Sequence, residues 1–291
     1  MSSIHQFKHE AMKTTFSLLI ESEDAQLAQN VANVCIAQLD AIENTLSRYV
    51  EGSDVWQINH MHADQTLFLS EDCYDCLCGG LEAHRQTNGL FDITLGRQIE
   101  HRKNDLGGPA PDTAGQLIID PDRPAIHCRE PGREIDLGGI GKGFALDRMR
   151  ATMDEWGIKA ALLSAGSSTQ LAFGPKAWKI QLTGDHATRT IELKDQALSA
   201  SGTGIQGSHI VSPDTTQTSY SSTRIWFIDT TAALADAWST AALLMTPEEL
   251  TALAQSGATL FTETKTGLHP LTLSLSPSSS SSSSSSNSTT P

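Results

Sequence analysis

The fold is decided in the stretch Ile135-Asp136-Leu137-Gly138-Gly139-Ile140-Gly141-Lys142-Gly143-Phe144-Ala145-Leu146-Asp147. Glycines without a Cβ let this backbone come close to a ligand, immediately before a helix that we predict over Phe144–Trp156. The amide groups and the dipole of such a helix start favour an anion. A structural turn between a strand and a helix would use the same glycines, so the stretch alone leaves both interpretations open.

The spacing of these glycines excludes two nucleotide-binding motifs. A P-loop requires Gly five residues before Gly141 and Ser or Thr after Lys142, where this sequence has Asp136 and Gly143. A dinucleotide G-x-G-x-x-G is excluded because Phe144 stands where the third Gly belongs. An anion near this loop would therefore be bound in some other way.

Outward from this stretch, helical and strand patterns are mixed along the chain. Apolar residues at helical spacing predict a long amphipathic helix over Asp24–Leu46, and Ser70 and Gly89 mark the start and stop of a helix that runs through His84. The other expected elements are helices over Ala232–Met245 and from Thr246-Pro247 to near Gly257, and strands over Met12–Ile20, Ala160–Leu163, Trp178–Leu182, Arg189–Leu193, Arg224–Ile228 and Thr259–Thr262. This order predicts an α+β fold of mixed sheets and packed helices rather than a doubly wound sheet.

Composition limits the partners that the chain can have. The formal net charge of −14 argues against nucleic acid and against insertion into or adsorption to an anionic membrane. An acidic protein that handles a phosphate ester would need a metal ion to hold the anion. The Ser-rich residues 273–291 have nothing to bury, so we predict a disordered tail after one domain over residues 1–272.

The first residues and the cysteines indicate a cellular location. Residues 1–20 carry charges and only a short apolar run, which predicts no signal peptide, lipoprotein leader or transmembrane span. Five cysteines fit a reducing compartment better than a disulfide framework, so we expect a cytoplasmic protein. Cys73, Cys76 and Cys78 lie close together, but a helical pattern without a second Cys pair favours buried thiols over a metal site.

Three further features could carry chemistry. Asp236 and Thr240 are four residues apart on a predicted helix, so they share a face and could coordinate a hard cation such as Mg²⁺. Phe91-Asp92-Ile93-Thr94 places a carboxylate and a hydroxyl two residues apart after a helix stop, where an ordinary turn is the alternative. His209 lies in a polar, Gly-rich neighbourhood, where it could be a catalyst or a plain surface or core residue.

Taken together and in this order, these segments resemble the FAD:protein FMN transferase (ApbE-like) family. Similarity runs from about Met12 to Phe261. The matching segments are Asp136–Asp147 (family pattern D-L-G-G-I-A-K-G-Y-A-x-D), Phe91–Thr94 (F-D-x-T), Ser47–Asn59 (S-x-Y-x-x-x-S-x-x-x-x-x-N), Ala235–Ala241 (A-D-A-x-x-T-A), and Ser201-Gly202 with His209-Ile210 (T-S-G…H-I-x-D-P-x-T-G). The resemblance implies a single ApbE-like (T-fold-like) flavin transferase domain.

The resemblance also implies an activity and its residues. Family members hold FAD and Mg²⁺ and move FMN onto a Ser or Thr hydroxyl of an acceptor flavoprotein, releasing AMP. By this resemblance, Asp236, Thr240 and the backbone carbonyl of Gly139 would bind Mg²⁺, with Ser239 nearby. The residues implied at the FAD site are Met12, Tyr49, Leu90, Phe91, Asp92, Asp136, Lys142 and Ile210. His209 would lie beside the pyrophosphate, and the base would be His209 or a water linked to Asp236.

The sequence departs from the family pattern at several positions. Lys13 replaces a Gly in the opening M-G-T, Ser168 replaces the Asp of L-G-G-D, and Ser212 replaces the Asp of H-I-x-D-P. Gly141 replaces an Ala, which we expect to be harmless. The metal helix and the loop over Asp136–Asp147 are intact, so FAD and metal binding are more secure predictions than turnover. A Mg²⁺-dependent FAD pyrophosphatase and a catalytically silent flavin-binding homologue are the alternatives.

Overall fold

The computed structural model describes residues 2–104, 106–202, 211–212, 220–264 and 267–271. The strands are β1 (Ser3–Ala11), β2 (Thr14–Ser22), β3 (Gln65–Phe68), β4 (Gln116–Ile119), β5 (Ala125–Glu130), β6 (Ala160–Ala165), β7 (Thr169–Phe173), β8 (Trp178–Thr183), β9 (Thr188–Leu193), β10 (Gln196–Gly202), β11 (Arg224–Asp229), β12 (Thr259–Thr264) and β13 (Gly267–Leu271). The helices are α1 (Ala25–Leu46), α2 (Asp54–Asn59), α3 (Glu71–Gln86), α4 (Gly96–Lys103), α5 (Gly141–Glu155), α6 (Ala232–Leu243) and α7 (Pro247–Gln255).

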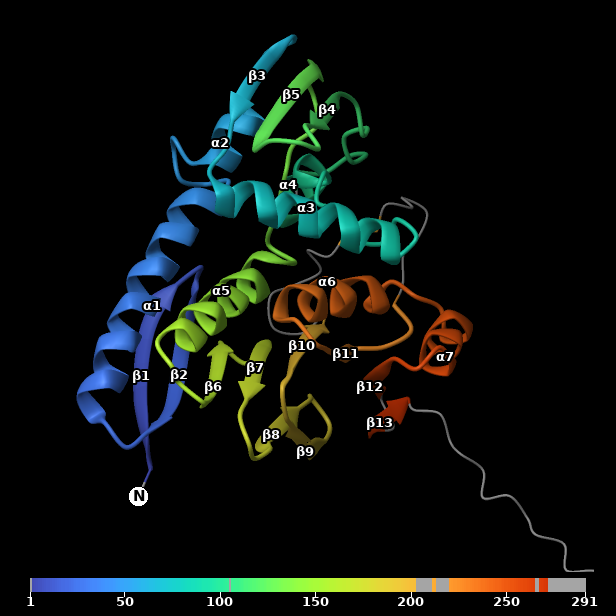
Figure 1. Cartoon of the computed structure of the whole chain (residues 1–291). Helices are drawn as coiled ribbons and strands as arrows, with labels where there is room; N and C mark the ends of the chain where they lie inside the picture. The colour runs from blue at the N-terminus through green and yellow to red at the C-terminus, as the bar shows by residue number, and fades with distance from the viewer. Residues whose placement is uncertain (1, 105, 203–210, 213–219, 265–266, 272–291) are drawn as a thin grey trace, which may run out of the picture.

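One large antiparallel sheet organises the molecule. Its strand order is β1-β2-β6-β7-β10-β11-β12-β13, and every neighbouring pair is antiparallel. A small sheet, β3-β5-β4, lies with α2 and α4 beyond one end of this sheet, and β8 and β9 form a separate hairpin (Figure 1). The predicted α+β class with mixed sheets and packed helices is confirmed.

The helices α1, α5 and α6 lie along one face of the large sheet (Figure 1). Alternation along the strands explains this arrangement, since successive side chains point to opposite faces. In β11, Ile225 and Phe227 pack with the apolar residues of α6 and α7, whereas Trp226 packs on the other face with the β8–β9 hairpin. At β11, therefore, α6 and α7 pack on one face of the sheet and the β8–β9 hairpin packs on the other.

Local sequence signals explain where the main helices begin. The side chain of Asp24 accepts hydrogen bonds from the first turn of α1, and Ser70 does the same for α3. Both starts agree with the predictions. The α5 helix begins at Gly141, three residues earlier than predicted, because low-propensity glycines conceal its first turn.

The predicted single strand over Met12–Ile20 is wrong at its start. The chain forms a hairpin there, in which β1 and β2 are joined by Met12 and Lys13, both with positive φ (49° and 60°). Neither residue is a Gly or Asn, so the turn had no sequence signal. The sequence reading also gave no elements for β1, β3, β4, β5, β7, β10, β13, α2 and α4.

Four of the five cysteines are buried, and Cys78 is partly buried. Cys73 and Cys76 are buried on α3, and burial raises the pKa of both thiols. Within the described ranges, no three His, Cys, Asp or Glu side chains gather as a metal-binding group. The burial of Cys73 and Cys76 agrees with the preference for buried thiols. In the same part of the chain, no helix combines the length and apolar character needed to cross a membrane.

Candidate active site

The carboxylate of Asp236 is the centre of the candidate site. It lies on α6 facing the sheet, and the residue is only 3% exposed. Its Oδ1 accepts hydrogen bonds from Ser199 Oγ at 2.9 Å and from Thr169 Oγ1 at 3.4 Å. Its Oδ2 is buried and accepts no hydrogen bond from the described residues. One oxygen is thus fixed by hydroxyls from two strands, and the other is open to a cation.

The glycine loop before α5 lies against this carboxylate. Lys142 Nζ is 3.5 Å from Asp236 Oδ2 and donates to the carbonyl of Gly138 at 3.2 Å. A Cβ on Gly139 would lie 3.4 Å from Thr240 Oγ1 and 2.9 Å from the ring of Phe91, so the backbone of Gly139 closely approaches both side chains. The loop and α6 therefore converge at Asp236.

Hydroxyl groups complete this part of the site. Ser239 and Thr240 both donate to the main-chain oxygen of Asp236, at 2.9 and 3.2 Å. Ser201 Oγ lies 2.9 Å from Ser239 Oγ and 3.2 Å from Thr240 Oγ1. One carboxylate oxygen, hydroxyls and a nearby loop carbonyl form a set of hard oxygen ligands, which suits Mg²⁺ in chemistry. Oδ2 of Asp236 is buried, accepts no hydrogen bond from the described residues and already lies beside one cation, the Lys142 ammonium, which is the observation that fits a bound cation best.

Asp147, at the end of the glycine stretch, lies on α5 and links this helix to α6 by hydrogen bonds. Its two carboxylate oxygens accept the N–H groups of Ala232 and Ala233 at 2.8 and 2.9 Å, at the first turn of α6. Burial raises the pKa of Asp147 to about 6, and the two backbone hydrogen bonds oppose this shift. A Cβ on Gly143 would lie 2.1 Å from the carbonyl oxygen of Ala232, so α5 and α6 meet backbone against backbone.

Tyr49 and Asp136 form a second part of the site, in which the tyrosine ring is exposed and the carboxylate is buried. The ring of Tyr49 is half exposed, and Lys103 Nζ lies 3.3 Å from its hydroxyl and 3.8 Å from Asp136 Oδ2. Arg48 lies 3.5 Å from the same carboxylate oxygen. Burial raises the pKa of Tyr49, while the hydrogen bond from Lys103 lowers it. Lys103 thus links two side chains that the sequence placed at the FAD site.

The turn between β1 and β2 reaches this second part. The amide of Met12 donates to Glu43 Oε1 at 2.8 Å, which anchors the turn to α1. Lys13 Nζ lies 4.5 Å from the centre of the Tyr49 ring, at cation–π distance. The lysine that departs from the family pattern therefore covers one candidate flavin-contacting ring.

In the Leu90–Asp92 segment, Phe91 packs against Gly139 of the glycine loop, and Asp92 forms a local turn. Phe91 is buried beside Gly139, as described above, and Leu90 packs against the core. Asp92 Oδ1 accepts from the amide and the hydroxyl of Thr94, both at 2.8 Å. The ordinary-turn alternative raised for Asp92 thus describes its hydrogen bonds, and its role toward FAD stays a prediction.

Two predicted site residues, His209 and Ile210, lie outside the described residues. Of the departures, Ser168 lies in the turn between β6 and β7 and donates to the Ala165 carbonyl at 3.2 Å, and Ser212 is buried. Gly141 has no atom within 4 Å of the place where a Cβ would lie, so an Ala would fit there, as expected. The predicted tail, residues 273–291, also lies outside the described residues.

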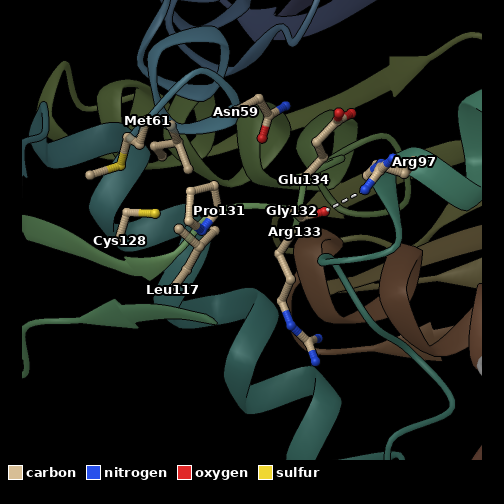
Figure 2. A pocket seen from close by; sticks show the side chains of 10 residues that line it. Asn59, Met61, Arg97, Leu117, Cys128, Pro131, Gly132, Arg133 and Glu134 are labelled. Carbon is tan, nitrogen blue, oxygen red and sulfur yellow. Dashed lines mark hydrogen bonds between the residues drawn. The ribbon is translucent and has the colours of Figure 1, made fainter. Parts of the chain in front are cut away.

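A cavity of about 190 Å³ lies apart from Asp236, between the small sheet and α4 (Figure 2). In Figure 2, Arg97 points to the carbonyl of Gly132, 3.4 Å away. Asn59 is occupied by two hydrogen bonds to the backbone of Ile135, at 2.7 and 3.0 Å. Asn59 thus holds the backbone at the start of the glycine stretch, and the residues that line the cavity include none of the predicted site residues.

The sequence reading missed several functional neighbours. Ser199 and Thr169 hold Asp236, while Arg48 and Lys103 hold Asp136. One signal could have found Ser199, because Ser199 and Ser201 are two residues apart and so share a strand face. The others come from elements far away in the chain, which no local pattern connects to the site.

Comparison with known proteins is consistent with this geometry. A model described as the ApbE family matches residues 12–261. The chain belongs to the ApbE family. The resemblance inferred from five short motifs is therefore confirmed.

Relatives and solved structures of ApbE proteins cover most of the chain. It is 25% identical over 278 residues to the FAD:protein FMN transferase of Klebsiella pneumoniae (strain 342), covering 82% of this chain and 77% of that one. It resembles the apo flavinyl transferase ApbE of Pseudomonas stutzeri with a TM-score of 0.80 and 22% identity, over 92% of this chain and 94% of that one. The ApbE protein of Thermotoga maritima also gives a TM-score of 0.80, at 23% identity, over 92% and 97%. The structural likenesses show the ApbE fold.

Proposed function

We propose that this chain is a Mg²⁺-dependent FAD:protein FMN transferase, which attaches FMN from FAD to a Ser or Thr hydroxyl of an acceptor flavoprotein and releases AMP. The observation that carries the proposal is the buried Asp236 carboxylate beside the glycine loop, in which Oδ1 is fixed by hydrogen bonds and Oδ2 accepts none from the described residues. Membership of the ApbE family and relatives named FAD:protein FMN transferase support the same activity.

In this proposal, Asp236 Oδ2, the Thr240 hydroxyl and the Gly139 carbonyl would hold the metal, with Ser239 nearby. Ser199 and Thr169 keep the carboxylate in one orientation by donating to Oδ1. When bound, Mg²⁺ supplies positive charge that neutralises the diphosphate and the AMP leaving group. An acidic protein can then hold a dianion.

The FAD would lie between the two parts of the site. Met12, Tyr49 and Asp136 would come from the second part of the site, Leu90, Phe91 and Asp92 from the segment beside Gly139, and Lys142 from the start of α5. Ile210, which lies outside the described residues, is included by the family resemblance alone. Tyr49 offers a half-exposed aromatic face, on which a flat ring can stack. Lys142 offers the ammonium nearest to Asp236 among the described residues.

The proposed transfer step replaces one bond to phosphorus with another. The acceptor hydroxyl oxygen forms a bond to the FMN phosphorus, the bond from that phosphorus to the bridging oxygen breaks, and AMP leaves with the electron pair. The hydroxyl proton goes to a base, for which His209 or a water linked to Asp236 is proposed. We expect no step that oxidises or reduces the flavin.

The test measures AMP and acceptor mass in the same reaction. The purified chain is mixed with FAD, Mg²⁺ and a flavoprotein that carries a Ser or Thr attachment site. We expect AMP release together with an increase in acceptor mass equal to FMN, and a loss of both in Asp236→Asn and in chelator. Asp64→Asn is the control, because Asp64 is exposed and its positive φ suits Asn.

The other outcomes separate the alternatives. AMP release without a mass increase would indicate hydrolysis of FAD by water. FAD binding with no AMP at all would indicate a silent flavin-binding protein. Activity that survives in Asp236→Asn would contradict the metal assignment.

A further inference from the structure

Asp236 carries a buried negative charge that requires a counter-ion. Its side chain is 5% exposed, and removing a carboxylate from water costs several kcal/mol unless an opposite charge compensates it. The hydroxyls of Ser199 and Thr169 are neutral donors and both bind Oδ1. The charge on Oδ2 must be balanced by another group.

Lys142 is the cation that lies closest to this oxygen in the described structure. Its Nζ is 3.5 Å from Oδ2, and it also donates to the Gly138 carbonyl at 3.2 Å. The ammonium therefore bridges a carboxylate on α6 and a carbonyl of the glycine loop. These are the same kinds of oxygen, from the same two segments, that the proposed Mg²⁺ would bind.

An ammonium and Mg²⁺ cannot both stay at Oδ2. A magnesium ion binds carboxylate oxygen at about 2.1 Å, which would leave it only a few ångströms from Nζ. Like charges so close repel strongly in a buried site. The Lys142 side chain is 24% exposed, so its flexible stem has a route toward solvent.

We propose that Lys142 is an internal counter-ion of Asp236, which Mg²⁺ displaces when it binds. The inference rests on the metal site of the proposed function and adds a role for this lysine. Without metal, the ammonium neutralises the carboxylate and keeps the loop against α6. With metal, the same ammonium is released at the mouth of the site, where it becomes available to a diphosphate.

Displacement couples the two ligands of the site. Metal binding delivers a divalent charge to Asp236 and at the same time frees a cation for the anion. A diphosphate that binds the freed lysine must strengthen metal binding by the same factor, because coupling between sites is reciprocal. Metal and FAD are therefore expected to bind more tightly together than either does alone.

The first experiment measures Mg²⁺ affinity by calorimetry on the whole chain without FAD. Lys142→Met removes the competing ammonium and keeps a chain of similar length, so we expect Mg²⁺ to bind about tenfold more tightly, because it no longer has to break the ion pair between Lys142 and Asp236. Lys179→Met, an exposed lysine on β8, is the control and should leave the affinity unchanged. Equal or weaker binding in Lys142→Met would overturn the proposal.

A second measurement needs no variant and so does not depend on folding of a mutant. Wild-type protein is labelled with acetic anhydride, with and without Mg²⁺, and the modification of Lys142 is compared with that of Lys179 by peptide mass. We expect Mg²⁺ to increase the labelling of Lys142 several-fold and not that of Lys179. Unchanged or reduced labelling of Lys142 would overturn displacement.

The two experiments also separate this inference from the function on which it rests. Mg²⁺ binding that Asp236→Asn abolishes, but that Lys142→Met does not tighten, would overturn the displacement alone. Wild-type protein that binds no Mg²⁺, in the presence of FAD as well as in its absence, would overturn the metal site and this inference together.

Discussion

The buried carboxylate of Asp236 and the half-exposed ring of Tyr49 are held in contrasting ways. Asp236 is fixed by hydroxyls from two strands of the large sheet, and a lysine balances its charge. Tyr49 is surrounded by long cationic side chains, of which Lys13 and Lys103 approach its ring to 4.5 and 5.7 Å. The first arrangement depends on fixed backbone positions, and the second on flexible side chains near solvent.

This difference shows where the site tolerates change. In the buried part, removing one partner leaves a polar group without a hydrogen bond, which is costly. Around the exposed ring of Tyr49, water can replace a lost contact. The substitution of Lys for a family Gly at position 13 lies beside the exposed ring, while Asp236 and Thr240 on α6 match the family pattern.

The largest expected effect is a change of stability with pH that comes from Asp147, the residue that links α5 to α6. Burial raises the pKa of Asp147 to about 6, so the folded protein binds this proton more tightly than the unfolded chain. The stability that comes from this group is complete below about pH 4 and is lost as the pH rises through about 6. We expect the unfolding free energy of wild type minus that of Asp147→Asn to fall by roughly 2 to 3 kcal/mol between pH 4 and 7.

Urea unfolding of both proteins across this pH range measures the difference. Comparison with Asp147→Asn cancels the carboxylates that the two proteins share. A difference that grows with pH would mean that the backbone hydrogen bonds to Ala232 and Ala233 outweigh burial.

The next effect tests the fixed orientation of Asp236. Ser199→Ala removes the 2.9 Å hydrogen bond to Oδ1, and we expect Mg²⁺ affinity to fall about tenfold, as for other groups that orient a metal ligand. Calorimetry measures the affinity. Ser164→Ala, a partly buried serine on β6 of the same sheet, should change it little. If both variants bind Mg²⁺ like wild type, the hydroxyls do not orient the carboxylate.

A smaller effect is expected when the exposed ring is removed. Tyr49→Leu should weaken FAD binding about fivefold, which corresponds to roughly 1 kcal/mol of aromatic stacking. Tyr49→Phe keeps the ring and should bind FAD nearly as wild type does. Flavin fluorescence titration in the presence of Mg²⁺ distinguishes them. Equal affinity in all three proteins would place the flavin elsewhere.

The smallest effect is expected at the turn. Lys13 has a φ of 60°, a conformation in which Gly is not strained, so Lys13→Gly should raise stability by about 0.5 kcal/mol and the melting temperature by about 1 to 2 °C. Lys13→Ala keeps the strain and should not gain stability. We expect FAD affinity to change less than twofold. A tenfold loss in Lys13→Gly would show that this lysine binds the ligand directly and would remove the contrast between the two parts.

The sequence predicted the parts of the site that are local in the chain. The positions of Asp236 and Thr240 on one helical face follow from their spacing alone, and the Thr240 hydroxyl indeed reaches the main chain of Asp236. The glycine loop and its helix could also be found locally. The roles of Thr169 and Ser199 could not, because strand pairing and the packing of α6 on β10 depend on residues far apart in sequence.

The ion pair between Lys103 and Asp136 could not be predicted either, because it also joins residues far apart in the sequence. Lys103 ends α4, a short helix that the sequence reading did not detect, and its contact with Asp136 depends on how the small sheet and α4 pack. The turn at Met12 and Lys13 was missed because neither residue type favours a positive φ. Family motifs supplied what local patterns could not, since they carry the result of tertiary packing.

The close contact at Gly143 restricts how the two segments of the site can change during evolution. Its missing side chain is what lets α5 touch the backbone of Ala232, so any larger residue would part the two helices. The loop that precedes α5 and the ligands on α6 are thus tied together, although they lie far apart in the chain. Descendants of this protein can vary the two segments only jointly, and recombination that exchanged one without the other would break the site even if every ligand residue were retained.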